Sequence, residues 1–105
     1  MQSAVQVTPN TQQEGTLYVV LGNGDDGSNV SFIHVKLMTL TDSVLFEKAF
    51  QNSEGIFSDG TYMSKKGIDW FFGLNRFQGL NSFKSEVYFE GQSGQTSPVV
   101  SYIKQ

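Results

Sequence analysis

Residues 83–103, FKSEVYFEGQSGQTSPVVSYI, decide the fold. In the first half of this stretch, Phe83, Val87 and Phe89 alternate with polar or aromatic residues, which is the period-two pattern of a strand that buries one face. Residues 91–94 (GQSG) have the composition of a tight turn, and residues 98–103 are apolar enough to form a second strand. The stretch therefore predicts an antiparallel hairpin.

The same two-residue rhythm recurs upstream. Between residues 30 and 39, one predicted strand face carries aliphatic residues and the other does not: Ile33, Val35 and Leu37 against Phe32, His34 and Lys36. Further strands are predicted over residues 5–7, 16–21, 44–50, 56–63 and 68–74, with turn residues between them. About seven strands at this spacing predict an all-β fold, a single antiparallel β-sandwich. A short helical turn within residues 65–77 is the alternative, although Gly67 and Gly73 disfavour it.

The size and composition bound the remaining possibilities. We expect one domain over residues 1–105, with residues 1–15 as a flexible or edge-pairing arm. Cysteine is absent, so we expect a disulfide-free fold without thiol chemistry. A net charge of −3, with no run of Lys or Arg, argues against a nucleic-acid partner or an anionic membrane surface. The sequence contains neither an apolar stretch of roughly 20 residues nor the basic and apolar parts of a signal peptide.

The last third carries a more specific pattern. An apolar residue lies six positions before an aromatic residue that opens an alternating strand, and a glycine hairpin and a Ser-Pro step follow; these residues are Phe77, Phe83, Val87, Phe89, Gly94 and Thr96-Ser97-Pro98. In this pattern the chain resembles a fibronectin type III or immunoglobulin-like domain, and the resemblance implies a two-sheet sandwich. The chain departs from the family at Phe83, where a tyrosine is usual, and at Tyr18, near which a core tryptophan is usual.

No pattern of catalytic residues is present. His34, the one histidine, occupies an alternating strand position and is expected to be a partly solvated strand residue. No serine lies in a Gly-x-Ser-x-Gly elbow. Glu86 and Glu90 share a strand face but lie four residues apart, roughly 13 Å, which exceeds the separation of a glycosidase pair. We therefore expect a protein that is not an enzyme and that needs no cofactor.

The loop of residues 22–29 (GNGDDGSN) has two interpretations. Oxygen atoms of Asp25, Asp26 and Asn29, with Asn23, are weak candidates for Ca²⁺ ligands. The spacing does not fit the usual calcium loop, and Asn-Gly and Asp-Gly steps are also what a long turn requires. A plain turn is the alternative to a metal site.

An aromatic cluster offers the candidate binding surface. Successive strand residues point to opposite faces, so Phe71 is expected to face away from Trp70 and Phe72. Exposed rings beside polar side chains suit sugar stacking or a protein contact. The candidate partner-binding residues are Trp70, Phe71, Tyr62, Asn75 and Arg76, and packing of these rings in the core is the alternative.

Three classes of function can be compared with these features. The first is a non-enzymatic structural or interaction module that docks on a larger assembly, such as a capsid decoration or tail protein of a phage or virus, on a virion or extracellular surface. Its partner would be a protein or a second copy, bound through the strand edges at residues 5–7 and 99–103 or through the aromatic patch. The second is a carbohydrate-binding module of a secreted or cell-surface protein, which would use Trp70, Tyr62 or Phe71. The third, an enzyme, has no catalytic pattern to support it.

Overall fold

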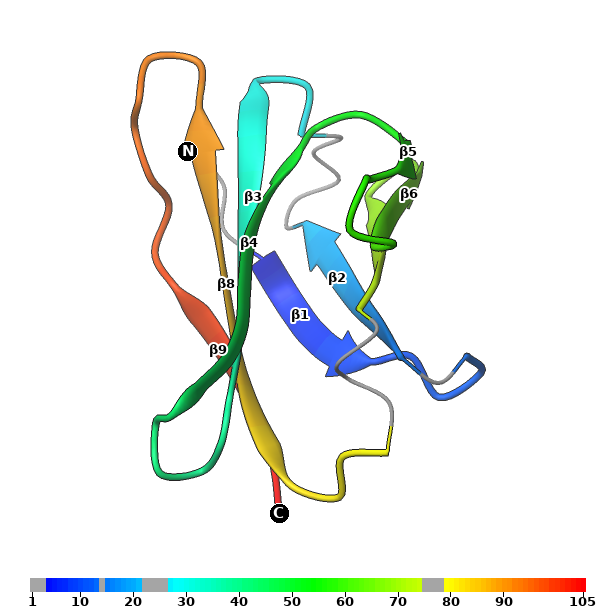
Figure 1. The fold of residues 1–105 in the computed structure, drawn as a ribbon. Coiled ribbons are helices and arrows are strands. Elements are labelled where there is room, and N and C mark those ends of the chain that lie inside the picture. The colour runs from blue at the N-terminus through cyan, green and yellow to red at the C-terminus, as the bar shows by residue number, and fades with distance from the viewer. Residues whose placement is uncertain (1–3, 14, 22–26, 75–78) are drawn as a thin grey trace.

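The computed structural model describes residues 4–13, 15–21, 27–74 and 79–105, which form two antiparallel sheets that pack face to face (Figure 1). The five-stranded sheet has the order β1 (Ala4–Pro9), β2 (Thr16–Leu21), β7 (Asp69–Gly73), β6 (Tyr62–Lys66) and β5 (Gly55–Ile56). The four-stranded sheet has the order β4 (Val44–Gln51), β3 (Val30–Met38), β8 (Phe83–Gly91) and β9 (Val100–Lys104). The prediction of an all-β sandwich is confirmed.

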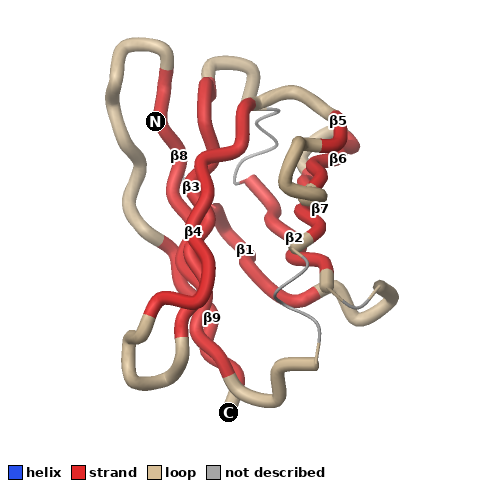
Figure 2. The backbone as a smooth tube through the Cα atoms, in the orientation of Figure 1, coloured by secondary structure: helices blue, strands red, loops and turns tan. Residues whose placement is uncertain are grey.

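Two details of the sequence prediction change. The described residues form nine strands rather than about seven, and the window of residues 56–63 divides at a turn closed by a hydrogen bond from the Gly60 N–H to the Phe57 carbonyl. A helical turn is absent from residues 65–74, which belong to the β6–β7 hairpin and its continuation, and Figure 2 shows no helix anywhere in the described chain. β-Branched and aromatic residues fit the pleated surface of this hairpin better than a helix.

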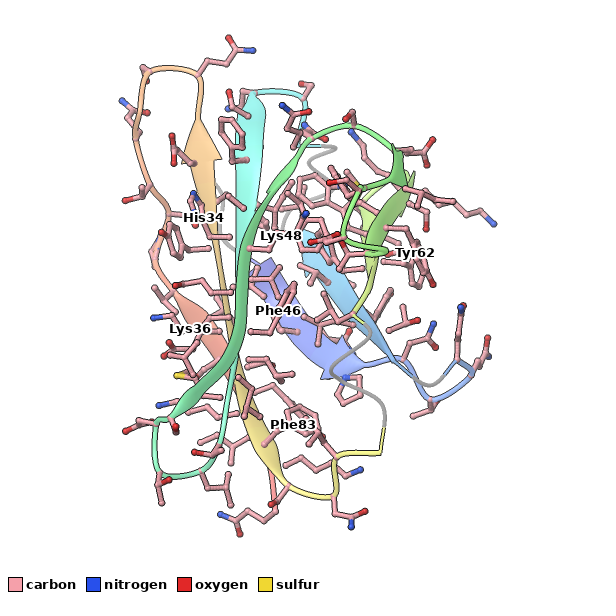
Figure 3. The ribbon with its side chains drawn as sticks, viewed as in Figure 1. His34, Lys36, Phe46, Lys48, Tyr62 and Phe83 are labelled. Atoms are coloured by element: carbon pink, nitrogen blue, oxygen red, sulfur yellow. The ribbon has the colours of Figure 1, made fainter. Side chains whose placement is uncertain are left out.

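Strand β3 has the two faces that its alternation predicts. Ile33, Val35 and Leu37 are fully buried, while His34 and Lys36 are half-buried on the outer face. Figure 3 shows His34 and Lys36 projecting away from the five-stranded sheet, and Phe46 of β4 pointing toward it. The predicted position of His34, on a partly solvated strand face, is confirmed.

The inner faces of both sheets supply one core. From the five-stranded sheet, Trp70 and Phe72 of β7 are fully enclosed, and the Trp70 ring packs edge-on against Phe89 of β8 with 5.3 Å between ring centroids. The other buried apolar residues of this core are Val7, Leu17, Val19, Leu21, Val30, Ile33, Val35, Leu37, Phe50, Met63, Leu74, Phe83 and Val87. Because Trp70 and Phe72 point inward, Phe71 between them points outward, and the prediction that it faces away from both is confirmed.

The two predicted edges are edge strands. β1 ends the five-stranded sheet and β9 ends the four-stranded sheet, and the two strands contact each other on the same side of the sandwich. Val7 of β1 is buried, and Tyr102 of β9 packs on Phe83 with 6.0 Å between ring centroids. The contact between β1 and β9 closes this side of the sandwich.

A charged contact closes the opposite side. Lys48 of β4 pairs with Val35 and so lies on the inner face of its sheet, where its ammonium group lies 2.8 Å from Asp59 Oδ2 and 4.5 Å from the centre of the Phe57 ring. Asp59 Oδ1 also accepts hydrogen bonds from the Thr61 hydroxyl at 2.6 Å and the Thr61 N–H at 3.0 Å. Figure 3 shows Lys48 reaching from β4 toward the loop after β5. The contact joins the two sheets at the β4–β5 side.

Replacing the neighbouring rings of β7 tests this division between core and surface. Trp70→Ala removes a fully enclosed ring and should lower the free energy of unfolding by about 3–5 kcal/mol. Phe71→Ala removes a half-buried ring and should cost less than half as much. Urea unfolding followed by circular dichroism measures both values. Equal losses would contradict the assignment of the two faces.

The Lys48–Asp59 contact predicts a pH dependence of stability. Hydrogen bonds to its carboxylate hold the pKa of Asp59 well below its usual value. The largest effect comes from the Lys48 ammonium group, followed by the Thr61 hydroxyl and the Thr61 N–H. A carboxyl whose folded pKa is lowered contributes stability that is complete above its unfolded pKa of about 3.9 and is lost as the pH falls below it. The free energy of unfolding, measured with urea, should therefore fall more between pH 6 and pH 3 for the native chain than for Asp59→Asn. Equal losses in the two proteins would contradict this role of Asp59.

Candidate functional site

The outer face of the five-stranded sheet carries a row of outward side chains. The register pairs Thr8 with Tyr18, Tyr18 with Phe71, and Phe71 with Ser64, so these residues lie side by side across β1, β2, β7 and β6. Directly paired residues in a sheet have their side chains on the same face at close distance. All of these side chains are half-buried rather than enclosed.

Tyr18 and Phe71 form a ring pair at the centre of this row. Their ring centroids are 5.1 Å apart with 33° between the ring planes. The Tyr18 hydroxyl donates a hydrogen bond to Asp69 Oδ1 at 3.1 Å. Burial of the ring, followed by the hydrogen bond and the negative charge of Asp69, raises the pKa of Tyr18 above its ordinary value. Tyr18 therefore keeps its proton and holds the Asp69 carboxylate in a fixed position.

The ring pair lies in an open groove of about 710 Å³, called here the β1–β2–β7 groove. Tyr18, Phe71 and Asp69 line it from β2 and β7. Its remaining lining comes from β1 and the following turn, with Gln6, Thr8, Pro9, Asn10, Thr11 and Gln12, and from β9, with Tyr102 and Lys104. The groove therefore combines aromatic rings, neutral amides and hydroxyls, and two groups of opposite charge.

The turn after β1 is held by its own hydrogen bonds. The Asn10 side-chain oxygen accepts a hydrogen bond from the Gln12 N–H at 3.0 Å, which is the usual bond of an Asx turn. The Asn10 N–H donates to the Thr16 carbonyl at 2.8 Å. These bonds fix the rim of the groove against the start of β2.

Tyr62 lies on the same face but outside the groove lining. Its ring covers Gly73, where an added Cβ would lie 1.9 Å from a ring carbon, and its hydroxyl lies 3.2 Å from Thr16 Oγ1. The glycine leaves room for the ring, and the contact ties β6 across β7 to β2. Tyr62 thus packs beside the ring pair and supports the sheet.

The structure separates the candidate residues that the sequence suggested. Phe71 lines the groove, and Tyr62 lies on the same outer face but is not part of the lining. The expectation that Trp70 contacts a partner is wrong for the folded chain, because its ring has no exposed surface. Asn75 and Arg76 lie outside the described residues.

The calcium candidates receive no support from what is described. Asp25 and Asp26, together with Asn23, lie outside the described residues, and Asn29 is exposed. Among residues 4–13, 15–21, 27–74 and 79–105, no three His, Asp or Glu side chains gather as a metal would require.

Sequence reasoning missed Tyr18 and Asp69 as site residues. Residues 17–21 are all apolar or aromatic, so the sequence did not distinguish the two faces of this strand and did not place Tyr18 outward. The missing information was the pairing of β2 with β7, because Tyr18 and Asp69 are 51 residues apart in the chain.

The opposite outer face carries a second polar contact. The rings of His34 and Tyr88 are stacked with 4.3 Å between centroids and 4° between planes, and His34 Nε2 lies 2.9 Å from Glu90 Oε1. His34 pairs with Tyr88 across β3 and β8, and Glu90, which pairs with Phe32, is its diagonal neighbour; cross-strand contacts of this kind stabilise a sheet. The cluster lies on the outer face of the four-stranded sheet, and none of its three residues lines the β1–β2–β7 groove.

No protein-family model, curated protein or solved structure matches the chain. Within the described residues, no helix has the length and apolar character needed to cross a membrane.

The Tyr18–Asp69 contact predicts a measurable titration. Removal of the negative charge in Asp69→Asn should lower the pKa of Tyr18 toward the ordinary tyrosine value of about 10. Ultraviolet absorbance of tyrosinate measures this, with Tyr18→Phe identifying which step of the curve belongs to Tyr18. An unchanged step in Asp69→Asn would show that the two groups do not interact in solution.

Proposed function

We propose that this chain is a non-enzymatic interaction module that docks on a larger assembly through the β1–β2–β7 groove. The observation that carries the proposal is the Tyr18–Phe71 ring pair, which remains partly exposed inside a concave surface. Partly exposed aromatic rings in a cavity are typical of recognition sites, because a partner that covers them gains a large contact area with few side-chain rotations to restrict.

The lining of the groove supports binding rather than a reaction. Among the described residues that line it, the ionisable groups other than tyrosines are Asp69 and Lys104. Asp69 accepts the hydroxyl of Tyr18, and the raised pKa of Tyr18 keeps that hydroxyl protonated, so Tyr18 does not act as a base. His34 and Glu90 lie on the other sheet.

The surroundings of β9 support attachment to a larger body. Val99 and Ile103 have 55% and 52% of their surface exposed, near the edge of the four-stranded sheet. Apolar side chains at a sheet edge favour contact with another protein or a second copy. A virion, as a capsid decoration or tail protein, or another extracellular surface is the setting that we propose for this module.

We also propose that the sandwich is of the immunoglobulin-like class. The orders β1-β2-β7-β6 and β4-β3-β8-β9 support this, because they match the A-B-E-D and C′-C-F-G sheets of such sandwiches when the strands are counted along the chain. The two-residue strand β5 extends the first sheet beyond that pattern.

Oxidative footprinting tests the docking face even while the partner is unidentified. The chain in the assembly isolated from its native source is compared with the purified free chain after brief exposure to hydroxyl radicals. We expect Tyr18 and Phe71 to be several-fold less oxidised in the assembly, because a partner in the groove excludes solvent from both rings.

Tyr88, on the outer face of the other sheet, is the internal control and should be oxidised equally in both samples. Equal oxidation of Tyr18 and Phe71 in the two samples would contradict docking through the groove. Protection confined to Val99 and Ile103 would place the docking surface on β9 instead.

A further inference from the structure

We propose that the ligand of the β1–β2–β7 groove is a neutral oligosaccharide. The inference rests on the proposed function, because it names the chemical class that the same groove would take. It replaces the sugar site suggested by the sequence, in which Trp70 was a stacking residue, with one built on Tyr18 and Phe71.

The ring pair provides the apolar part of the site. One face of a pyranose ring carries C–H groups with slight positive charge, and the face of an aromatic ring carries slight negative charge, so the two stack. Tyr18 and Phe71 each lie on a strand paired on both sides, which holds the rings in place before a ligand arrives. With 5.1 Å between centroids and 33° between planes, the two rings also pack on each other.

The rim provides the polar part. Amides of Gln6, Asn10 and Gln12 and hydroxyls of Thr8 and Thr11 line the groove beside the rings. Amides and hydroxyls can each donate and accept hydrogen bonds. The hydroxyls of a sugar can do the same, so the two sets of groups are complementary. A peptide that binds by adding a strand would require a free sheet edge, but β1 pairs with β2 on one side and lies against β9 on the other.

Asp69 is the residue that we assign to specificity. A carboxylate accepts hydrogen bonds only, at two oxygens, and Oδ1 already accepts the Tyr18 hydroxyl at 3.1 Å. In the proposed site, the carboxylate lies in the same lining as the rings and accepts a ligand hydroxyl in addition to the Tyr18 hydroxyl. Tyr18 therefore has two functions, as a stacking ring and as the group that positions Asp69.

The charges of the groove favour a neutral ligand. Lys104 is the only cation among the described residues of its lining, and Asp69 lies in the same lining. A nucleic acid or a sulfated glycan requires several cations in a row, whereas these described residues offer one cation and one anion in a chain of net charge −3. The volume of about 710 Å³ falls within the roughly 300–1,000 Å³ of small-ligand sites.

Isothermal titration calorimetry tests the inference with the intact chain. The probes are neutral gluco-, xylo-, manno-, galacto- and N-acetylglucosamine oligosaccharides, with heparin as the acidic comparison. We expect at least one neutral series to bind and heparin not to bind. In that series Phe71→Ala should weaken binding about tenfold or more, since ring stacking is lost. Asp69→Asn should weaken binding of some sugars of that series more than of others, because Asp69 is the residue assigned to specificity.

Tyr88→Ala is the matched control, because it removes a half-buried ring from the outer face of the other sheet and should leave affinity unchanged. Thermal unfolding checks that every variant is folded, and Tyr18→Phe, which keeps the ring, gives a milder second variant. Absence of binding to all neutral probes at millimolar concentration, or equal weakening by Tyr88→Ala, would overturn the carbohydrate assignment. Protection of Tyr18 and Phe71 in the native assembly would then still support the proposed function with another ligand.

Discussion

The inward packing of Trp70 and Phe72 between the two sheets determines what this protein presents to its surroundings. Both rings are fully enclosed by the core, and strand geometry then leaves Phe71 no position except the outer face. A shift of β7 by one residue would exchange these faces and expose two rings in place of one. Burial of aromatic surface inside the sandwich thus fixes the position of the ring pair outside it.

The sequence was sufficient for strands whose two faces differ strongly in polarity. β3 and β8 alternate clearly, so their faces and their hairpin connections were predictable from local pattern, and the strand period placed Phe71 opposite Trp70 and Phe72. The buried state of Trp70 was not predictable, because a single strand does not indicate which of its faces meets the other sheet. The groove was also unpredictable, since β1, β2, β7 and β9 come together only through pairings between distant parts of the chain.

The residues around the groove show how the framework and the site are combined. Tyr62 fills the space above Gly73 and contacts Thr16, so that three strands are joined next to the ring pair. On the other rim, the Asn10 turn is fastened to the beginning of β2. Rings and rim are therefore carried by paired strands and a closed turn, which suits a site that binds without rearrangement.

The position of Lys48 has a consequence for how copies of this chain can assemble. A charged side chain on the inner face of β4 deters a neighbouring strand from adding there, whereas β9 at the opposite end of that sheet has Val99 and Ile103 exposed nearby. Growth of the four-stranded sheet from molecule to molecule is therefore blocked at one end. A symmetric contact that used only the β9 end would be complete with two molecules and would not extend this sheet any further.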